Sequence, residues 1–286
     1  MNNDNKVDLN SLVKTLNKMN NKKKYKKYFF IFLSVILIVC IGFYSLNILN
    51  NLSDKKKIVD KEKEIRDIVD VEEITDVGEA INPPEDRTGL YWQFINYSMI
   101  DVDINKLKQS NSDTKGWLFV NNTNINYPVV QSTDNDFYLT HQFDKSYNSA
   151  GWVYMDYRNS NIMDNNRNTI IYGHGLKNRT IFGSLKNTLK SDWYNTNENL
   201  VIKTVDENSS YLWQVFSIYT LVTNNDYIQT DFFGDEEYVD FLNLISGRSI
   251  KNFNVPLTKD DKVLTLSTCY TDDKKLVVHA KMIKKS

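Results

Sequence analysis

An uncharged apolar run near the N-terminus restricts what this chain can fold into more than any other feature. Residues 28–49 read YFFIFLSVILIVCIGFYSLNIL. A helix needs about 20 apolar residues to cross the hydrocarbon core of a bilayer, and this run is long enough. A buried core helix seldom lacks charge over such a length, and a cleaved signal peptide would be shorter and would end at a small-x-small site. The run therefore predicts one transmembrane helix.

The charges on the two sides of this run predict its orientation. Residues 13–27 contain seven lysines and no acid, whereas residues 50–64 contain five lysines and four acids. Lysine-rich flanks stay on the cytoplasmic side of a membrane, and acids count for little in this rule. We therefore expect residues 1–27 to form a basic cytoplasmic tail and the larger C-terminal part to lie outside the cell.

Residues 50–85 are predicted to link the membrane span to a folded domain that begins at residue 86. Residues 54–77 are charged, with apolar residues at helical spacing, which predicts a stalk helix that ends before Pro83-Pro84. Residues 86–108 carry apolar residues at three- and four-residue steps. We therefore expect one or two amphipathic helices there, packed on the part of the domain that follows.

From Gly116 onward the pattern changes to that of β-strands, with short runs of β-branched and aromatic residues between turns. Short helices are expected between these strands at 180–189 and 235–247. Many short strands at this spacing favour a closed barrel or a sandwich over a parallel α/β sheet, so the fold class is mostly β. The eight predicted strands are 117–120, 125–131, 151–155, 168–174, 200–204, 211–219, 262–269 and 276–282.

The predicted folded domain contains a single cysteine, Cys269, because the other cysteine, Cys40, lies in the apolar run. Cys269 ends the strand Val263-Leu-Thr-Leu-Ser-Thr-Cys269, and the polar turn Thr271-Asp272-Asp273 is close behind it. A lone cysteine is most often a small core residue. A thiol at the open end of a strand, however, can be reached by a substrate. Cys269 is therefore a candidate nucleophile.

A cysteine nucleophile needs a nearby base, which is usually a histidine. His174 ends a predicted strand between Gly173 and Gly175, and glycines on both sides let the backbone turn sharply and leave the ring uncovered. His141 lies in a polar loop, and His279 lies inside the last strand, where a structural role is the default. We therefore rank His174 first as the acid–base group and His141 second.

Several segments together resemble the sortase family of cysteine transpeptidases. Thr265-Leu-Ser-Thr-Cys269 resembles the TLxTC signature of that family, and Tyr172-Gly-His174 followed by Ile181-Phe-Gly-Ser-Leu185 looks like its histidine segment. Asn126-Tyr-Pro-Val-Val-Gln131 and Asp134-Asn-Asp-Phe-Tyr-Leu139 are similar to the first-strand region of class B sortases. The helical N-terminal addition and the helix at 235–247, between the sixth and seventh strands, also look like class B. The resemblance covers about residues 86–286.

This resemblance implies a membrane-anchored enzyme of a Gram-positive cell surface, built on the eight-stranded sortase barrel. Such enzymes cleave a C-terminal sorting signal after its threonine, hold the product as a thioacyl-enzyme, and pass it to an amine of a cell-wall peptide. Class B signals resemble NP-x-T-N or NP-x-T-G. By the same resemblance Cys269 is the nucleophile. His174 protonates the leaving amine and later takes a proton from the incoming one.

Five further positions match residues that contact the sorting peptide in class B sortases. They are Asn135, Leu139 and Ser267, together with Tyr227 and Ile228 just before the helix at 235–247. The resemblance implies no cofactor. The sequence shows no closely spaced set of metal ligands and no phosphate-binding glycine loop, and its net charge of −1 gives no hint of nucleic-acid binding.

One position departs from the family, which places an arginine at the start of the last strand to steady the substrate and the oxyanion. The matching residue here is Lys275, which keeps the charge but loses the planar fork of a guanidinium. Either Lys275 takes that role, or a distant arginine (Arg158, Arg179 or Arg248) folds into the gap, or Lys275 is only a solvated edge-strand lysine.

Two other functions compete with an active transpeptidase. The lysine at the arginine position favours a catalytically weak or inactive sortase-like domain that only binds surface peptides. The other alternative is an unrelated membrane-tethered thiol hydrolase of the Cys-His-Asn type, but no CG-x-C-W-like segment surrounds Cys269.

Overall fold

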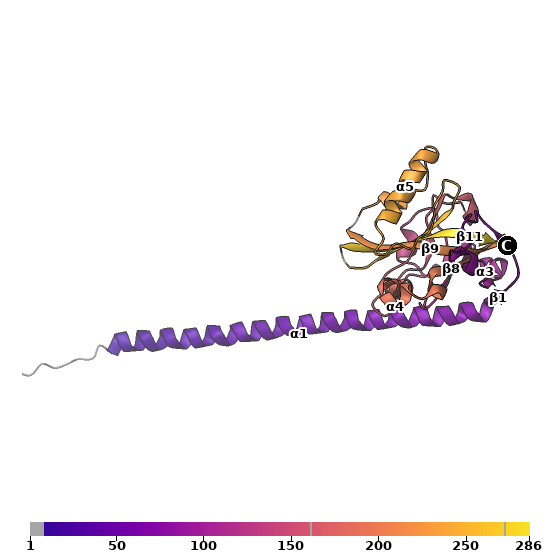
Figure 1. Ribbon diagram of the computed structural model, residues 1–286. Helices are drawn as coiled ribbons and strands as arrows, with labels where there is room; N and C mark the ends of the chain where they lie inside the picture. The colour runs from indigo at the N-terminus through magenta and orange to yellow at the C-terminus, as the bar shows by residue number, and fades with distance from the viewer. Residues whose placement is uncertain (1–8, 161, 223, 272) are drawn as a thin grey trace, which may run out of the picture. The chain divides into compact units, whose positions relative to one another are not determined.

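The computed structural model describes residues 9–160, 162–222, 224–271 and 273–286. Contacts divide the chain into two compact units, one up to Ser53 and one from Asp54 onward. Helix α1 (Leu9–Ile68) begins in the first unit and contains there the whole apolar run 28–49 (Figure 1), whose side chains are exposed. By length and composition this helix is long and apolar enough to cross a membrane. The predicted helix over 28–49 is therefore present.

The second unit begins with the last turns of α1, which pack on the domain. Ile58 and Ile65 are buried there, and Lys61 pairs with Asp144 at 2.8 Å. The apolar residues whose spacing predicted a stalk helix thus face the domain, and the compact unit of the structure begins at Asp54. The helix also ends at Ile68 instead of continuing to 77, because the next residues form strand β1 (Glu72–Ile74), which pairs with β3 (Met99–Asp101).

Residues 86–108 form two short helices with a strand between them. Helix α2 (Tyr91–Phe94) precedes β3, and α3 (Ile104–Ser110) follows it. The side chain of Asp103 caps α3 by accepting a hydrogen bond from the backbone N–H of Lys106 at 2.9 Å. Two helices are therefore present where one or two were predicted, but β3 was missed because three residues are too few to establish a strand period.

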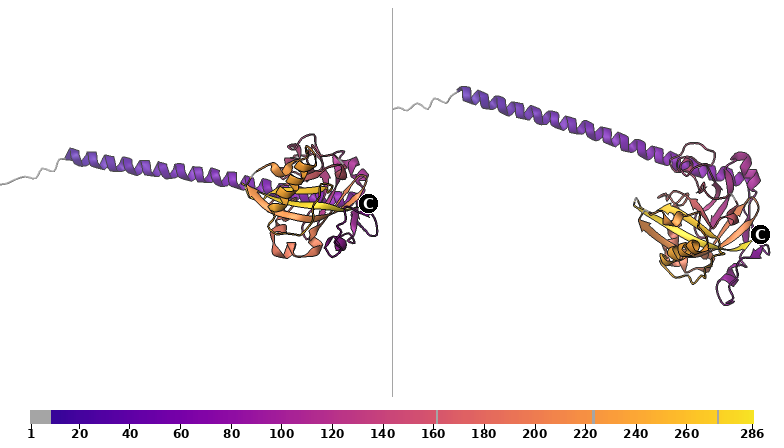
Figure 2. Two further views of the ribbon diagram at one scale, coloured as in Figure 1. Left: turned by 45° about the horizontal axis from the view of Figure 1, so that its top comes forward. Right: turned by 90° about the horizontal axis from the view of Figure 1, so that it is seen from above.

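Eight strands form a closed barrel. They are β4 (Thr114–Val120), β5 (Asn126–Val130), β6 (Tyr154–Met155), β7 (Asn168–Tyr172), β8 (Val201–Asp206), β9 (Ser210–Val222), β10 (Val263–Cys269) and β11 (Lys274–Lys285). Their order is β10-β7-β6-β5-β4-β8-β9-β11, and β11 pairs back onto β10, which closes the barrel. The predicted eight-stranded barrel is confirmed. Figure 2 shows β9, β10 and β11 running side by side, and a short strand β2 (Glu79–Ala80) extends the far end of β11.

Helices and 3-10 turns fill the connections between the strands. Helix α5 (Asp235–Gly247) lies between the sixth and seventh barrel strands, as predicted. It buries Tyr238, Phe241, Leu242 and Ile245 at helical spacing in a cluster with Phe216 and Val277 of the barrel. The short helix predicted at 180–189 is a 3-10 helix, η3 (Gly183–Leu189), followed by α4 (Ser191–Tyr194). The remaining turns are η1 (Phe137–Leu139), η2 (Met163–Asn165), η4 (Asn197–Leu200) and η5 (Asp226–Ile228).

Candidate active site

Cys269 lies exposed at the end of β10, where the chain turns into β11. The antiparallel register pairs Cys269 directly with Lys275, and paired side chains project from the same face of a sheet. The ammonium of Lys275 donates a hydrogen bond to the Sγ atom of Cys269 at 3.0 Å. The short turn between the two strands therefore holds a positive charge against the candidate nucleophile.

The three arginines named as alternatives to Lys275 are bonded elsewhere. Arg158 forms two parallel hydrogen bonds with Asp156, at 2.8 and 2.7 Å. Arg248 forms a similar pair with Asp226. Arg179 donates to the side chain of Asn187 at 3.1 Å. Among the described residues, Lys275 is thus the cation that bonds to Cys269.

His174 follows β7, which runs parallel to β10 and pairs Tyr172 with Ser267. The turns after the two strands therefore lie at the same end of the barrel. A Cβ atom on Gly175 would lie 2.0 Å from the carbonyl oxygen of Cys269, so only glycine allows this close approach. The hydroxyl of Thr268 also donates to the carbonyl of Gly173 at 2.7 Å, which ties the histidine turn to the cysteine strand.

The ring of His174 hydrogen-bonds to the chain rather than to Cys269. Its Nε2 lies 2.8 Å from the carbonyl oxygen of Leu139. A carbonyl oxygen can only accept, so Nε2 carries the hydrogen in this contact. The proton on Nε2 points at Leu139, and Nδ1 is the ring nitrogen left for other partners.

The other two histidines have different surroundings. His279 is fully buried, with Nδ1 2.8 Å from the hydroxyl of Thr265 and Nε2 2.8 Å from that of Tyr219. Burial, and to a smaller extent the charge of Arg248, lowers the pKa of His279 to about 3, so the ring stays neutral. His141 stacks on Phe137 with ring centres 4.1 Å apart. Of the three, His174 is the one tied to the end of β10.

The five residues expected to contact a peptide all lie in one connected region. The hydroxyls of Tyr227 in η5 and Ser267 on β10 are 2.9 Å apart, and both residues are buried. Ser267 lies two residues before Cys269 on the same strand. Leu139 is half-buried and contacts His174 through its carbonyl. Asn135 and Ile228 belong to segments far apart in the sequence, yet both bond to the Asp156–Arg158 pair.

Sequence reasoning missed Asp156, which follows β6 and is 0% exposed. Its carboxylate accepts hydrogen bonds from Asn135, Arg158 and Tyr172. Burial alone would raise the pKa of Asp156, but the bonds from Arg158 and Tyr172 outweigh burial and hold that pKa below its ordinary value. An acidic residue followed two positions later by an arginine was the available signal, but nothing in that spacing shows that the carboxylate is buried.

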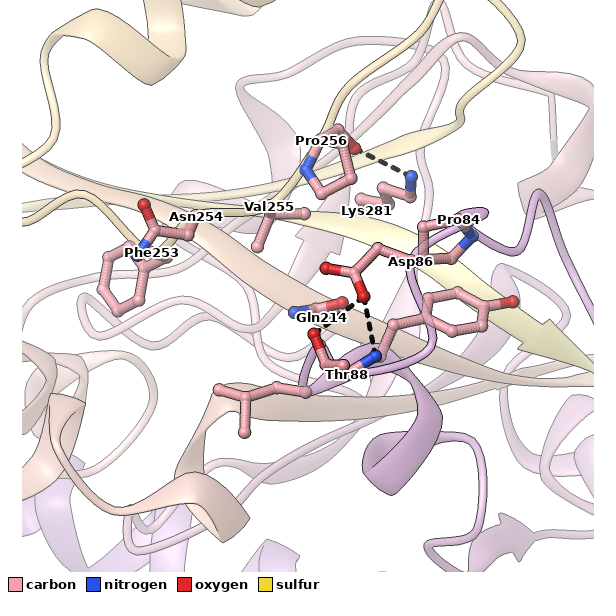
Figure 3. A pocket seen from close by; sticks show the side chains of 12 residues that line it. Pro84, Asp86, Thr88, Gln214, Phe253, Asn254, Val255, Pro256 and Lys281 are labelled. Atoms are coloured by element: carbon pink, nitrogen blue, oxygen red, sulfur yellow. Dashed lines mark hydrogen bonds between the residues drawn. The ribbon is translucent and has the colours of Figure 1, made fainter.

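A separate cavity of about 270 Å³ lies at a distance from these residues (Figure 3). Its walls are the segment from Pro84 to Tyr91 and the segment from Phe253 to Pro256, with Gln214 and Lys281 between them. Lys281 pairs with Gln214 well along β11 from Lys275. The cavity therefore lies away from Cys269 and adds nothing to the candidate active site.

Comparison with known proteins identifies the family. The profile of the sortase domain matches residues 118–283, which include His174, Cys269 and Lys275.

The chain belongs to the sortase family.

Relatives of this sortase are class B enzymes. It is 38% identical to sortase B of Staphylococcus aureus over 184 residues, which covers 63% of this chain and 74% of that protein. The solved Staphylococcus aureus sortase B–substrate complex is 37% identical, with a TM-score of 0.59 over 63% of this chain and 84% of that one. A sortase B structure complexed with triglycine is 34% identical, with a TM-score of 0.59 over 69% of this chain and 88% of that one. The predicted resemblance to class B sortases is confirmed.

Proposed function

We propose that this sortase is a membrane-anchored cysteine transpeptidase. It cleaves a C-terminal sorting signal after threonine and joins the surface protein, through a thioacyl-enzyme, to an amine of a cell-wall peptide. The contact between Lys275 and Cys269 carries this proposal, because it places a fixed cation beside an exposed thiol at the end of the barrel that also holds His174. No cofactor is needed for this chemistry.

The three residues take successive parts in acyl transfer. The sulfur of Cys269 attacks the threonine carbonyl, and the oxygen that becomes negative is stabilised by a donor aimed at it, here the ammonium of Lys275. His174 takes the proton of the Cys269 thiol and gives it to the amine that leaves, so the peptide bond breaks and a thioester remains. The incoming amine then attacks the thioester and gives a proton to His174, which returns it to the sulfur of Cys269 as Cys269 is released.

The sorting peptide binds along the region that holds the five expected contact residues. Asn135, Leu139, Ser267, Tyr227 and Ile228 are its proposed contacts, and the signal has the form NP-x-T-N or NP-x-T-G. The relative from Staphylococcus aureus was solved as a substrate complex, and another sortase B was solved with triglycine. Those two complexes support a peptide substrate and a peptide amine as the partners of this chain.

The membrane anchor is the helix over residues 28–49, with residues 1–27 in the cytoplasm and the barrel outside the cell. The lysine-rich N-terminal flank supports this orientation. Protease added to protoplasts stripped of their cell wall should digest the barrel. Complete protection of the barrel, with digestion only after lysis, would contradict the orientation.

The function is tested by trapping the thioester. The full chain in detergent is incubated with NP-x-T-N and NP-x-T-G peptides, and the protein is examined by mass spectrometry for an added peptide fragment. Addition of triglycine should convert the adduct into a ligated product. Binding of a peptide without adduct or cleavage would favour the second candidate function, a sortase-like domain that only binds surface peptides. The lysine at the arginine position and the bond from His174 to Leu139 are the observations that favour that candidate.

Substitutions of Lys275 should separate a catalytic cation from a surface charge. Lys275→Ala is expected to slow peptide cleavage by roughly 10- to 1000-fold, as the loss of one oxyanion donor does in other enzymes. Lys275→Arg should be as fast as wild type or faster, because its planar fork offers two donors where the ammonium acts as a point charge.

The measurement is steady-state cleavage of one peptide by the three forms, with folding checked by circular dichroism. Lys274→Ala is the matched control, because Lys274 is the exposed neighbour on the same strand. A Lys275→Ala enzyme that cleaves at the wild-type rate would remove Lys275 from the mechanism.

A further inference from the structure

An ion pair between a buried carboxylate, that of Asp156, and an exposed guanidinium, that of Arg158, lies beside the candidate active site and takes no part in the chemistry above. Asp156 is fully buried, and both of its oxygens are used. Oδ1 accepts from the backbone N–H and Nε of Arg158, at 3.0 and 2.8 Å. Oδ2 accepts from Arg158 Nη2 at 2.7 Å, from the hydroxyl of Tyr172 at 2.8 Å and from the amide of Asn135 at 3.0 Å. One carboxylate thus joins three segments of the chain.

Arg158 extends the connection to a fourth segment. Its Nη2 also donates to the carbonyl oxygen of Ile228 in η5, at 2.9 Å. At the other end of η5, Arg248 donates two hydrogen bonds to the carboxylate of Asp226 from the C-terminal end of helix α5. The 3-10 turn that carries Tyr227 and Ile228 is therefore bonded at one end to Arg158, which follows barrel strand β6, and at the other end to Arg248, which follows α5.

The segments joined by this pair are those that carry the proposed peptide contacts. Asn135 precedes η1, Tyr172 lies two residues before His174, and Ile228 lies on the long connection between β9 and β10. Strand pairing does not fix the distance from Asn135 to Ile228, because both lie in connections outside the strands. The path from Asn135 through Asp156 and Arg158 to Ile228 fixes it instead.

The guanidinium suits this position better than other cations would. Two of its nitrogens bond Asp156 in parallel, and one of these two also reaches the carbonyl of Ile228. A bidentate arginine–carboxylate pair adds a fixed direction to its charge. A lysine would keep the charge, but its ammonium is a point charge on a flexible stem and lacks the planar fork.

We propose that Asp156 and Arg158 are positioning residues that set the separation of the two sides of the peptide site. Arg158 holds the η5 side through Ile228, and Asp156 holds the opposite side through Asn135 and Tyr172. This inference rests on the proposed peptide substrate. Loss of the pair weakens the fit of the sorting peptide and leaves Cys269, His174 and Lys275 in place, because none of these three bonds to it.

The test compares Arg158→Ala and Arg158→Lys with wild type, using the full chain in detergent and one NP-x-T-N or NP-x-T-G peptide. Arg158→Ala should raise KM roughly 10-fold or more, the size expected when charge-assisted bonds that order a binding segment are lost, with kcat changed less than about 3-fold. The KM of Arg158→Lys should lie between that of wild type and that of Arg158→Ala. The rate at which iodoacetamide alkylates Cys269 should not change, since that small reagent needs no peptide site.

Arg167→Ala is the matched control. Arg167 also bridges a carboxylate and a backbone carbonyl, those of Asp235 and Gly234, but it lies just before β7, at the opposite end of that strand from His174. Its removal should leave KM at the wild-type value. Asp156→Asn combined with Arg158→Ala should raise KM no further than Arg158→Ala alone, because the two residues act as one unit.

The outcomes separate this inference from the proposed function. If wild type forms no adduct with any sorting peptide, the proposed function fails. If wild type is active and Arg158→Ala has an unchanged KM, or loses kcat at constant KM, the positioning role is wrong. If Arg158→Ala does not fold, Arg158→Lys decides, and an unchanged KM for that variant overturns the inference.

Discussion

Cys269→Ala is expected to abolish both peptide cleavage and the covalent adduct. The proposed reaction passes through a thioester, and alanine has no atom that can form one. Cys269 is the free cysteine at the tip of β10, and the ammonium of Lys275 contacts its sulfur at 3.0 Å. The measurement is mass spectrometry of the full chain after incubation with a sorting peptide, together with the rate at which cleaved peptide accumulates.

Cys40→Ala is the control for this experiment, because Cys40 is the other free cysteine and lies in the apolar run. It should keep both the adduct and the rate. Adduct formation by the Cys269→Ala protein would place the acyl group on another residue and remove Cys269 as the nucleophile. If Cys269→Ala still binds the sorting peptide as wild type does, the peptide site is formed, and the variant has lost only the chemical step.

Strands and helices whose apolar residues recur at a regular spacing could be predicted from the sequence. The eight barrel strands lie where short β-branched and aromatic runs predicted them. Helix α5 has the predicted bounds because its apolar residues recur at helical spacing and three acids, Asp235, Glu236 and Glu237, occupy its first turn. Lys275 was a candidate because it matches the position of the family's arginine, and only the register of β10 and β11 shows that it pairs with Cys269.

Features that depend on contacts between distant segments could not be predicted. Strands β1 and β3 have three residues each, so neither shows a recognisable alternation of apolar and polar residues. Helix α1 ends at Ile68 because of the pairing between β1 and β3, which no local signal announces. The burial of Asp156 could not be predicted for the same reason. It depends on the side chains of Asn135 and Tyr172, which only the folded barrel brings to Asp156.

The candidate site shows both cases. The residue types and their motifs made Cys269 and His174 the candidates, but the sequence could not show the hydrogen bond between His174 and Leu139. It also could not show that Gly175 is required by the carbonyl of Cys269, since that contact joins the ends of two parallel strands. The residue types at a site can thus be read from a sequence, whereas their bonding partners belong to the fold.

His174→Ala is expected to slow turnover by about 10²- to 10⁴-fold, the usual contribution of general acid–base catalysis. Without the imidazole, the leaving amine must depart without a proton, and the incoming amine has no base to accept its proton. Cleavage and triglycine ligation should both slow, while alkylation of Cys269 and circular dichroism should report a folded site. Added imidazole should restore part of the rate, because alanine leaves space where the ring was.

His141→Ala is the matched control, since His141 is the other histidine that is not fully buried. It should cleave at close to the wild-type rate. Because Nε2 of His174 donates to the carbonyl of Leu139, the ring either acts through Nδ1 or breaks that bond when the peptide enters. In both cases His174 is the group that protonates the leaving amine, so its removal should slow turnover by the whole of the roughly 10²- to 10⁴-fold range given above. A His174→Ala enzyme with a near-normal rate, and a His141→Ala enzyme that is slow, would transfer the acid–base role to His141.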